Sequence, residues 1–157
     1  MLIRLIQVGK TNAGYLQEGI REYESRLQHY IRFETITIDD LKNRSKMDEP
    51  LIKKKEGEQI LQKIDTSDFV ILLDEKGKTN SSIQFAKLIE KHTIQATKTL
   101  VFVIGGAYGF SDELYQRAQS KLSLSPMTFS HQMVRLFFVE QVYRAMTIMR
   151  GEKYHHG

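Results

Sequence analysis

The sequence predicts an α/β fold, a mostly parallel sheet with helices on both faces. Short β-rich runs alternate with segments whose apolar residues recur every three or four positions, which is the pattern of strands joined by helices. Two runs, Phe69–Leu73 and Thr99–Ile104, are almost entirely apolar, as is typical of strands buried on both faces of a parallel sheet. A length of 157 residues suits a single domain, residues 1–157, because domains usually span roughly 100–200 residues.

The first two strands and the helix between them follow from the local pattern. Leu2–Val8 predicts the first strand, and Thr11 and Asn12 are candidates to cap the helix that follows. The apolar residues of this helix are spaced by three or four positions and so share one face; they are Leu16, Ile20, Tyr23 and Leu27. Phe33–Ile38 alternates apolar and polar residues and predicts the second strand.

The second helix follows a polar and basic segment, Leu41–Met47, which is expected to be a mobile loop. Pro50 suits the first turn of this helix. Gly57 lies inside it and costs about 1 kcal/mol relative to alanine, so we expect a structural reason for this glycine. Phe69–Leu73 then predicts the third strand, which is followed by Asp74.

The second half of the chain continues the alternation. Ser81 and Gln84 form a candidate capping box for a third helix that extends to about His92. After the strand at Thr99–Ile104, Ser111 is a candidate N-cap for a short helix. The last two expected elements are a short strand at Leu122–Leu124 and a long helix from about His131 to Met149.

Composition excludes several kinds of site. Lys and Arg number 23 against 19 Asp and Glu, a formal net charge of +4, and cysteine is absent. The absence of cysteine excludes disulfides, thiolate metal sites and a cysteine nucleophile, and it fits the reducing cytoplasm. No metal site is expected, because His29, His92 and His131 lack the spacing of metal ligands. No apolar run approaches the roughly 18–20 residues that cross a bilayer, so no membrane partner is expected.

Three loops follow strands that we expect to lie close together in the sheet. They are the strand end at Leu73-Asp74, the turn Gly105–Gly109 and the segment Leu122–Phe129. Because the carboxyl ends of parallel strands meet at one edge, these loops can form an apolar crevice with free backbone groups, which suits an adenosine-sized ligand. The Gly105–Gly109 turn lacks both the lysine of a P-loop and the spacing of the dinucleotide fingerprint. On its own, a simple turn is an equal alternative.

The last helix is apolar around roughly two thirds of its circumference. A domain of this size seldom buries a helix on so many sides, so homodimerisation through this helix is favoured over burial within one chain. Glu140 and Arg144 stand four residues apart in the favourable order for an ion pair. A purely structural pair is the alternative to a functional one.

Two polar segments allow more than one interpretation. Lys42, Arg44 and Lys46, with Lys53–Lys55, form a basic region that suits an RNA backbone. Nearby acidic residues partly offset this charge, and a solvated face is the alternative. The tail, Tyr154–Gly157, would ordinarily be a frayed end.

Several motifs together resemble those of one family. The longest are Phe102–Gly109, Leu122–Arg135 and Glu140–Ala145. Shorter matches are Val8-Gly9-Lys10, Glu22-Tyr23, Lys55-Glu56-Gly57-Glu58, Leu73-Asp74, Gly77-Lys78 and Tyr154-His155. On these residues the chain resembles the bacterial large-subunit ribosomal RNA pseudouridine N3-methyltransferases, which are minimal members of the SPOUT, or trefoil-knotted, methyltransferases.

The resemblance implies a parallel-sheet domain with a C-terminal trefoil knot, and a homodimer in which the partner chain completes each active site. It implies S-adenosylmethionine as the cofactor, and 23S ribosomal RNA within the ribosome as the substrate partner. The cofactor-binding residues that it implies are Leu73, Gly105, Leu124, Ser125, Pro126, Met127, Thr128 and Phe129.

Methyl transfer to N3 of a pseudouridine needs two kinds of group. The N3–H belongs to a neutral imide, so a base must remove its proton and a nearby cation must stabilise the anion that results. Arg135 and Arg144 are the candidates for the cation, and His131 and His155 are the candidates for the base. Tyr154 is expected to stack on the target base or to hydrogen-bond to it.

Two other functions stay open. One is a different α/β enzyme that binds another adenosine ligand, such as ATP or NAD. The other is a non-catalytic ribosome-binding factor, which would bind ribosomes without transferring a methyl group. The form of the RNA substrate, whether free RNA, the subunit or the assembled ribosome, also stays open.

Overall fold

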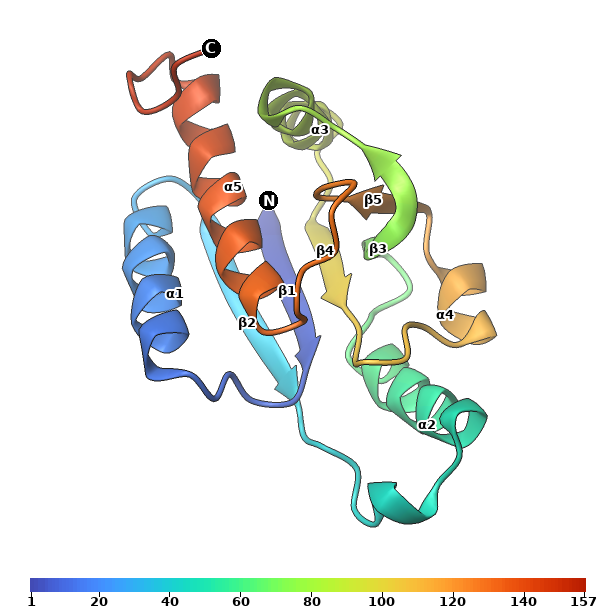
Figure 1. Cartoon of the computed structure of the whole chain (residues 1–157). Coiled ribbons are helices and arrows are strands. Elements are labelled where there is room, and N and C mark those ends of the chain that lie inside the picture. Colours follow the sequence, from blue (N-terminus) through green and yellow to red (C-terminus); the bar gives the residue numbers. More distant parts are fainter.

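A five-stranded parallel sheet forms the centre of the computed structural model, which describes residues 1–157 (Figure 1). Its strand order is β2-β1-β4-β3-β5, and every pair of neighbours runs parallel. The strands are β1 (Leu2–Val8), β2 (Arg32–Ile38), β3 (Phe69–Thr79), β4 (Thr99–Ile104) and β5 (Ser120–Ser123). The predicted α/β class is confirmed.

The helices form a layer on each face of the sheet. One layer contains α1 (Gly14–Leu27), α3 (Ser82–Ile94) and α5 (Met133–Met149), with α5 in contact with both others. The other layer contains α2 (Glu49–Leu61) and α4 (Asp112–Arg117), which contact each other. A single 3₁₀ turn, Arg44–Lys46, lies between β2 and α2.

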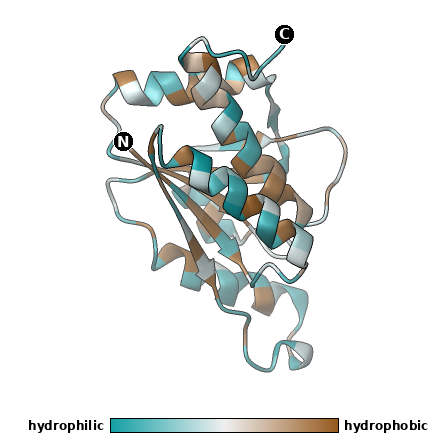
Figure 2. Cartoon of the chain, turned by 90° about the vertical axis from the view of Figure 1, so that its left-hand side faces the viewer, coloured by the Kyte–Doolittle hydropathy of each residue, from teal (hydrophilic) through white to brown (hydrophobic).

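The side chains of β4 alternate between the two faces of the sheet, and the sheet divides the hydrophobic core into two clusters. Leu100, Phe102 and Ile104 belong to the apolar cluster beneath α1, α3 and α5, whereas Val101 and Val103 belong to the cluster beneath α2 and α4. In Figure 2 the central strands are brown, the hydrophobic colour, and much of the outward side of the helices is teal. Burial on both faces explains why β4 is apolar along nearly its whole length.

Two of the three predicted helix caps are confirmed. The Ser81 side chain accepts from the backbone N–H of Gln84, whose side chain accepts in turn from the backbone of Ser81. Ser111 caps α4 through the N–H of Leu114. The predicted caps of α1 are wrong, because this helix begins at Gly14 after Ala13, without a side-chain cap.

Gln132 and Arg135, at the start of the last helix, bind the segment that was expected to cap α1. The Oγ1 of Thr11 accepts from Arg135 at 3.0 Å, and the backbone N–H of Asn12 donates to the side chain of Gln132 at 3.0 Å. Gln132 also donates to the carbonyl of Lys10 at 2.9 Å. Long-range bonds therefore override the local capping signal.

The third strand is longer than the apolar run that predicted it. It continues past Leu73 to Thr79 through an irregularity in its register, so that both Leu73 and Lys78 pair with Leu122 of β5. The predicted strand Leu122–Leu124 lies at Ser120–Ser123 instead. The loop after β5 consequently begins at Leu124 and faces the irregular part of β3.

Burial within the chain accounts for much of the apolar surface of α5. The helix begins at Met133 rather than His131 and packs between α1 and α3. Its fully or nearly fully buried apolar residues are Phe138, Val139, Val142, Ala145 and Met146. The apolar circumference of α5 is thus a weaker argument for a dimer than the sequence suggested, because the helix lies in the middle of a three-helix layer.

Gly57 permits close contact between α2 and the N-terminus of α4. A β-carbon at this position would lie 2.3 Å from Oγ and 3.0 Å from Cβ of Ser111, the N-cap of α4. We expect Gly57→Ala to lower the free energy of unfolding by about 1–3 kcal/mol through overpacking, although alanine favours helix. Urea unfolding measures the loss.

The matched control is Gly14→Ala, since Gly14 is the first residue of α1 and a β-carbon there meets nothing within 4 Å. This variant should stay within about 0.5 kcal/mol of the unsubstituted protein. Equal stability of the two variants would show that Gly57 is not needed for the contact.

Candidate functional site

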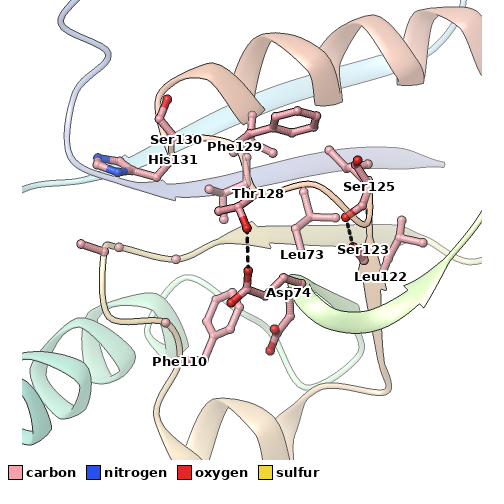
Figure 3. Close-up of a pocket in the computed structure, with 18 of the residues that line it drawn as sticks. Leu73, Asp74, Phe110, Leu122, Ser123, Ser125, Thr128, Phe129, Ser130 and His131 are labelled. Atoms are coloured by element: carbon pink, nitrogen blue, oxygen red, sulfur yellow. Dashed lines mark hydrogen bonds between the residues drawn. The ribbon is translucent and has the colours of Figure 1, made fainter.

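A pocket of about 410 Å³ lies beside the middle of β3 and the ends of β4 and β5 (Figure 3). Two of its walls are the loops after β4 and β5, as the sequence predicts from the carboxyl ends of parallel strands. The third wall is the irregular part of β3 from Leu73 to Glu75, where the sequence predicted a loop. The volume is within the usual range for small-molecule sites.

Seven of the eight residues expected to bind a cofactor line this pocket. They are Leu73, Gly105, Leu124, Ser125, Met127, Thr128 and Phe129. Pro126 belongs to the same loop but is not part of the lining. Asp74, which the sequence places at the same expected strand end as Leu73, also lines the pocket. Glu75, Phe110 and Val134 line it too, although the sequence did not identify them as ligand-binding residues. The position of Glu75 directly after Asp74 was the signal available for that residue.

Hydrogen bonds hold the loop after β5 in place. The hydroxyl of Ser123 donates to the carbonyl of Ser125 at 2.8 Å, and the side chain of Ser125 accepts from the N–H of Met127 at 2.9 Å. The hydroxyl of Thr128 donates to Glu75 at 3.3 Å, which connects the loop after β5 to β3 (Figure 3). These bonds fix the conformation of this pocket wall in the absence of a ligand.

Hydrogen bonds and burial set the protonation of polar side chains in and beside the pocket. Asp74 accepts from the backbone N–H of Lys76 at 2.9 Å and from the hydroxyl of Tyr115. Burial and this bond raise the pKa of Tyr115 to about 12, so Tyr115 keeps its proton as a donor. Burial, together with the cations Arg135 and Arg44, lowers the pKa of His131. His131 therefore offers a neutral imidazole to the pocket at neutral pH.

Three of the five expected catalytic residues form a second cluster at the C-terminal end of α5. Arg144 donates to Glu140 through Nε at 3.1 Å and Nη2 at 2.5 Å, and its Nη1 lies 3.2 Å from Nδ1 of His155. The guanidinium lies 4.8 Å from the ring centroid of Tyr154, whose hydroxyl donates to Glu140 at 3.0 Å. The hydroxyls of Tyr154 and Tyr23 are 3.2 Å apart. The tail is therefore packed against the helix rather than frayed.

Charge and burial reinforce this cluster. The bond to Glu140 raises the pKa of Arg144, so its guanidinium remains a cation. Burial raises the pKa of Tyr154, as do its bonds to Tyr23 and Glu140, so its hydroxyl remains protonated. The expected Glu140–Arg144 pair is present, and it orients a cation beside a titratable residue of the tail.

The pocket and the cluster lie at opposite ends of α5. His131 and Val134 line the pocket, whereas Arg144 lies about 16 Å further along the axis from Met133, at 1.5 Å per residue. Figure 1 shows the chain's C-terminus at the far end of α5 from the loop that precedes this helix. Within one chain, the cluster cannot contact a small ligand in the pocket.

Arg135, an expected catalytic residue, lies enclosed beside the end of β1. Its side chain is 0 % exposed, and it donates to the carbonyl of Val8 at 2.5 Å, to the carbonyl of Gly9 at 2.9 Å and to Thr11. Burial lowers its pKa. The guanidinium is enclosed, and its Nη1 and Nη2 bind groups at the end of β1, while its buried Nε has no hydrogen-bond partner. Arg135 therefore supports the strand end, and its expected catalytic role stays a prediction.

The chain shows neither a cluster of metal ligands nor a membrane-spanning helix. No three His, Asp or Glu side chains are grouped closely enough to bind a metal ion. No helix is both long and apolar enough to span a bilayer.

A parallel sheet with helices on both faces and a pocket beside its strand ends defines a ligand-binding domain of the α/β class. The chain resembles the crystal structure of a probable methyltransferase from Bordetella pertussis Tohama I, with a TM-score of 0.59 over 92% of this chain and 95% of the other. At 10% sequence identity, this likeness concerns the fold alone. Residues 1–155 match the model of the family described as predicted SPOUT methyltransferase, and the chain belongs to that family.

Relatives of similar length are much closer in sequence. A protein of Christiangramia forsetii is 56% identical over 156 residues, and one of Parabacteroides distasonis is 54% identical over 156 residues. In both cases 99% of each chain is covered, and both relatives are named ribosomal RNA large subunit methyltransferase H. The family suggested by the sequence motifs is confirmed.

The buried position of Arg135 predicts a large effect on stability. We expect Arg135→Met to lower the free energy of unfolding by about 2–4 kcal/mol, because it leaves buried carbonyls without a donor. Arg144→Met is the matched control on the same helix, and its partly exposed ion pair should contribute about 1 kcal/mol or less. Chemical denaturation measures both, and equal losses would contradict the structural role of Arg135.

Proposed function

We propose that this chain is an S-adenosylmethionine-dependent methyltransferase that modifies N3 of a pseudouridine in large-subunit ribosomal RNA. The observation that carries the proposal is the pocket formed by the irregular part of β3 and the loops after β4 and β5, in a chain that belongs to the SPOUT methyltransferase family. The names of its full-length relatives favour ribosomal RNA of the large subunit as the substrate.

The pocket residues fit S-adenosylmethionine. Leu73, Leu124 and Phe129 supply apolar walls for an adenine ring, and Asp74 is a carboxylate held as an acceptor that suits ribose hydroxyls. The glycine turn keeps the pocket open, since a β-carbon at Gly105 would lie 3.0 Å from the Phe110 ring. When bound, the cofactor supplies an activated methyl group on a sulfonium.

The remaining chemistry belongs to this chain's own residues. His131, whose pKa is lowered by burial, is neutral above that pKa and suits the acceptance of the N3 proton. Activity should fall as acid protonates this imidazole. His155 is the second candidate for the base, because its Nδ1 lies 3.2 Å from Nη1 of Arg144. Arg144, oriented by Glu140, suits the stabilisation of the negative imide oxygen. Tyr154 offers an aromatic face for the target base.

A homodimer would bring these two groups of residues together. The Arg144–His155 cluster is too far along α5 to serve the pocket of its own chain, so the pocket that it serves would be the partner's. Apolar side chains remain exposed beside the pocket: Met127 is 75% exposed, and Phe129 and Phe137, whose tilted rings lie 4.9 Å apart between centroids, are 38% and 39% exposed. A second copy of this surface is the natural cover for these residues. The trefoil knot stays an expectation from the family.

Radiolabelled methyl transfer tests the proposed function. Large-subunit RNA is offered as free RNA, as the isolated subunit and as the assembled ribosome, and the digested product is examined for N3-methylpseudouridine. We expect label in that nucleoside with at least one form. Ribosome binding without any transfer would support the ribosome-binding factor, and preferential binding of ATP or NAD would support a different adenosine-ligand enzyme.

Complementation tests the shared active site. Gly105→Val blocks the pocket and His155→Ala removes a residue of the tail, so each homodimer should lose at least about tenfold in activity. Coexpressed together, these two chains should recover about a quarter of normal activity, because half of the dimers then contain one intact site.

Two controls accompany this experiment. Gly105→Val coexpressed with Leu124→Asp should recover nothing, because both changes damage the same half of the site. His156→Ala alone should retain activity, since its side chain is exposed and outside the cluster. Activity that persists in a monomer during sedimentation, or absence of recovery in a folded mixed dimer, would contradict the shared site.

A further inference from the structure

Glu56 is a buried carboxyl group for which the proposed chemistry gives no role. Its side chain comes from α2, and the residue is only 3% exposed. Its Oε1 is buried and has no hydrogen-bond partner. Such a group costs free energy unless it is satisfied, so a partner from outside the chain is the natural explanation.

The carboxyl group lies directly behind the pocket wall. A β-carbon on Gly106 would be 2.8 Å from Oε1 and 3.0 Å from Oε2 of Glu56. Gly106 itself lines the pocket. The carboxyl group therefore packs against a glycine that lines the pocket, and a β-carbon at position 106 would require the end of the Glu56 side chain to shift.

The other carboxyl groups of the pocket already have partners. Asp74 accepts from Lys76 and Tyr115, and Glu75 accepts from Thr128. Glu56 differs from both, because no donor in the chain reaches it. It is the acidic group of this region with unused capacity to interact with a cation.

Charged neighbours of Glu56 come from the segment between β2 and α2. Burial raises the pKa of Glu56, as does Asp40, and Arg44 partly opposes this effect. The guanidinium of Arg44 also lies 5.5 Å from the ring centroid of Tyr108 in the glycine turn. The carboxyl group therefore holds its proton more tightly than an ordinary glutamate does, and a nearby positive charge would favour its release.

We propose that Glu56 is the electrostatic partner of the cofactor's sulfonium, acting through the thin wall at Gly106. The inference rests on the proposed function, which makes S-adenosylmethionine the cofactor. A carboxylate in a poorly solvated place attracts a cation more strongly than it would in water. The demethylated product, S-adenosylhomocysteine, is a neutral thioether and gains nothing from this charge. Glu56 would thus favour binding of the methyl donor over its product.

Calorimetry with the two ligands separates this role from a structural one. Glu56→Gln preserves the shape of the side chain and removes its charge. We expect the affinity for S-adenosylmethionine to fall about tenfold, and the affinity for S-adenosylhomocysteine to change by less than about twofold. Glu58→Gln, an exposed change two residues further along α2, should leave both affinities unaltered.

Each result then has one meaning. An equal loss for both ligands, or no loss for either, in a folded Glu56→Gln protein would overturn the role of Glu56 alone. If the unsubstituted protein binds neither ligand, the proposed cofactor is wrong and the inference fails with it.

The pH dependence of the ligand preference, compared between the unsubstituted protein and Glu56→Gln, gives a second measurement. Deprotonated Glu56 attracts the sulfonium and its protonated form does not, so the preference for S-adenosylmethionine over S-adenosylhomocysteine should rise with pH. Protonated His131 lines the pocket and would repel the sulfonium, which acts in the same direction. The rise should therefore be smaller, but not absent, in Glu56→Gln. A preference that is constant between about pH 5 and 8 would overturn the proposal.

Discussion

The guanidinium of Arg135 holds the last helix to the end of the first strand, and the site depends on this attachment. Its donors reach the carbonyls of Val8 and Gly9, and Thr11 beside them, across more than a hundred residues of chain. The bond pattern fixes the start of α5 against β1. His131 and Val134, at this end of the helix, therefore lie at the wall of the pocket.

A parallel sheet and one straight helix determine how the site is divided. The sheet brings the irregular part of β3 and the loops after β4 and β5 together and so creates the pocket, whereas α5 carries Arg144 away from it by about 1.5 Å per residue. The tail turns back on the helix and binds Glu140 and Tyr23 through Tyr154. The chain thus carries two separate groups of candidate site residues, and the proposed dimer is the arrangement that would use both.

Long-range contacts explain where local interpretation of the sequence failed. Ser81 and Ser111 were found as caps because a cap needs only a side chain and the next turn of helix. Thr11 has the same chemistry, but its hydroxyl accepts from Arg135 of α5. The apolar surface of α5 predicted a dimer interface, and much of this surface faces α1, α3 and the sheet, so it is a weaker argument for a dimer, which stays a prediction. Composition alone cannot distinguish these two kinds of burial.

By itself, the sequence determined the α/β class, the alternation of strands and helices, the segments that line the pocket and the family. The reason is that the spacing of apolar residues, the helix caps and the motifs each involve residues close together in the chain. Only the tertiary structure decided which charged side chains are enclosed. Arg135 is enclosed by bonds to β1, and Glu56 is enclosed because Gly57 lets α2 press against the turn before α4. The physical reason is that burial depends on elements far apart in the chain, whereas the sequence records the chemistry of each residue without its surroundings.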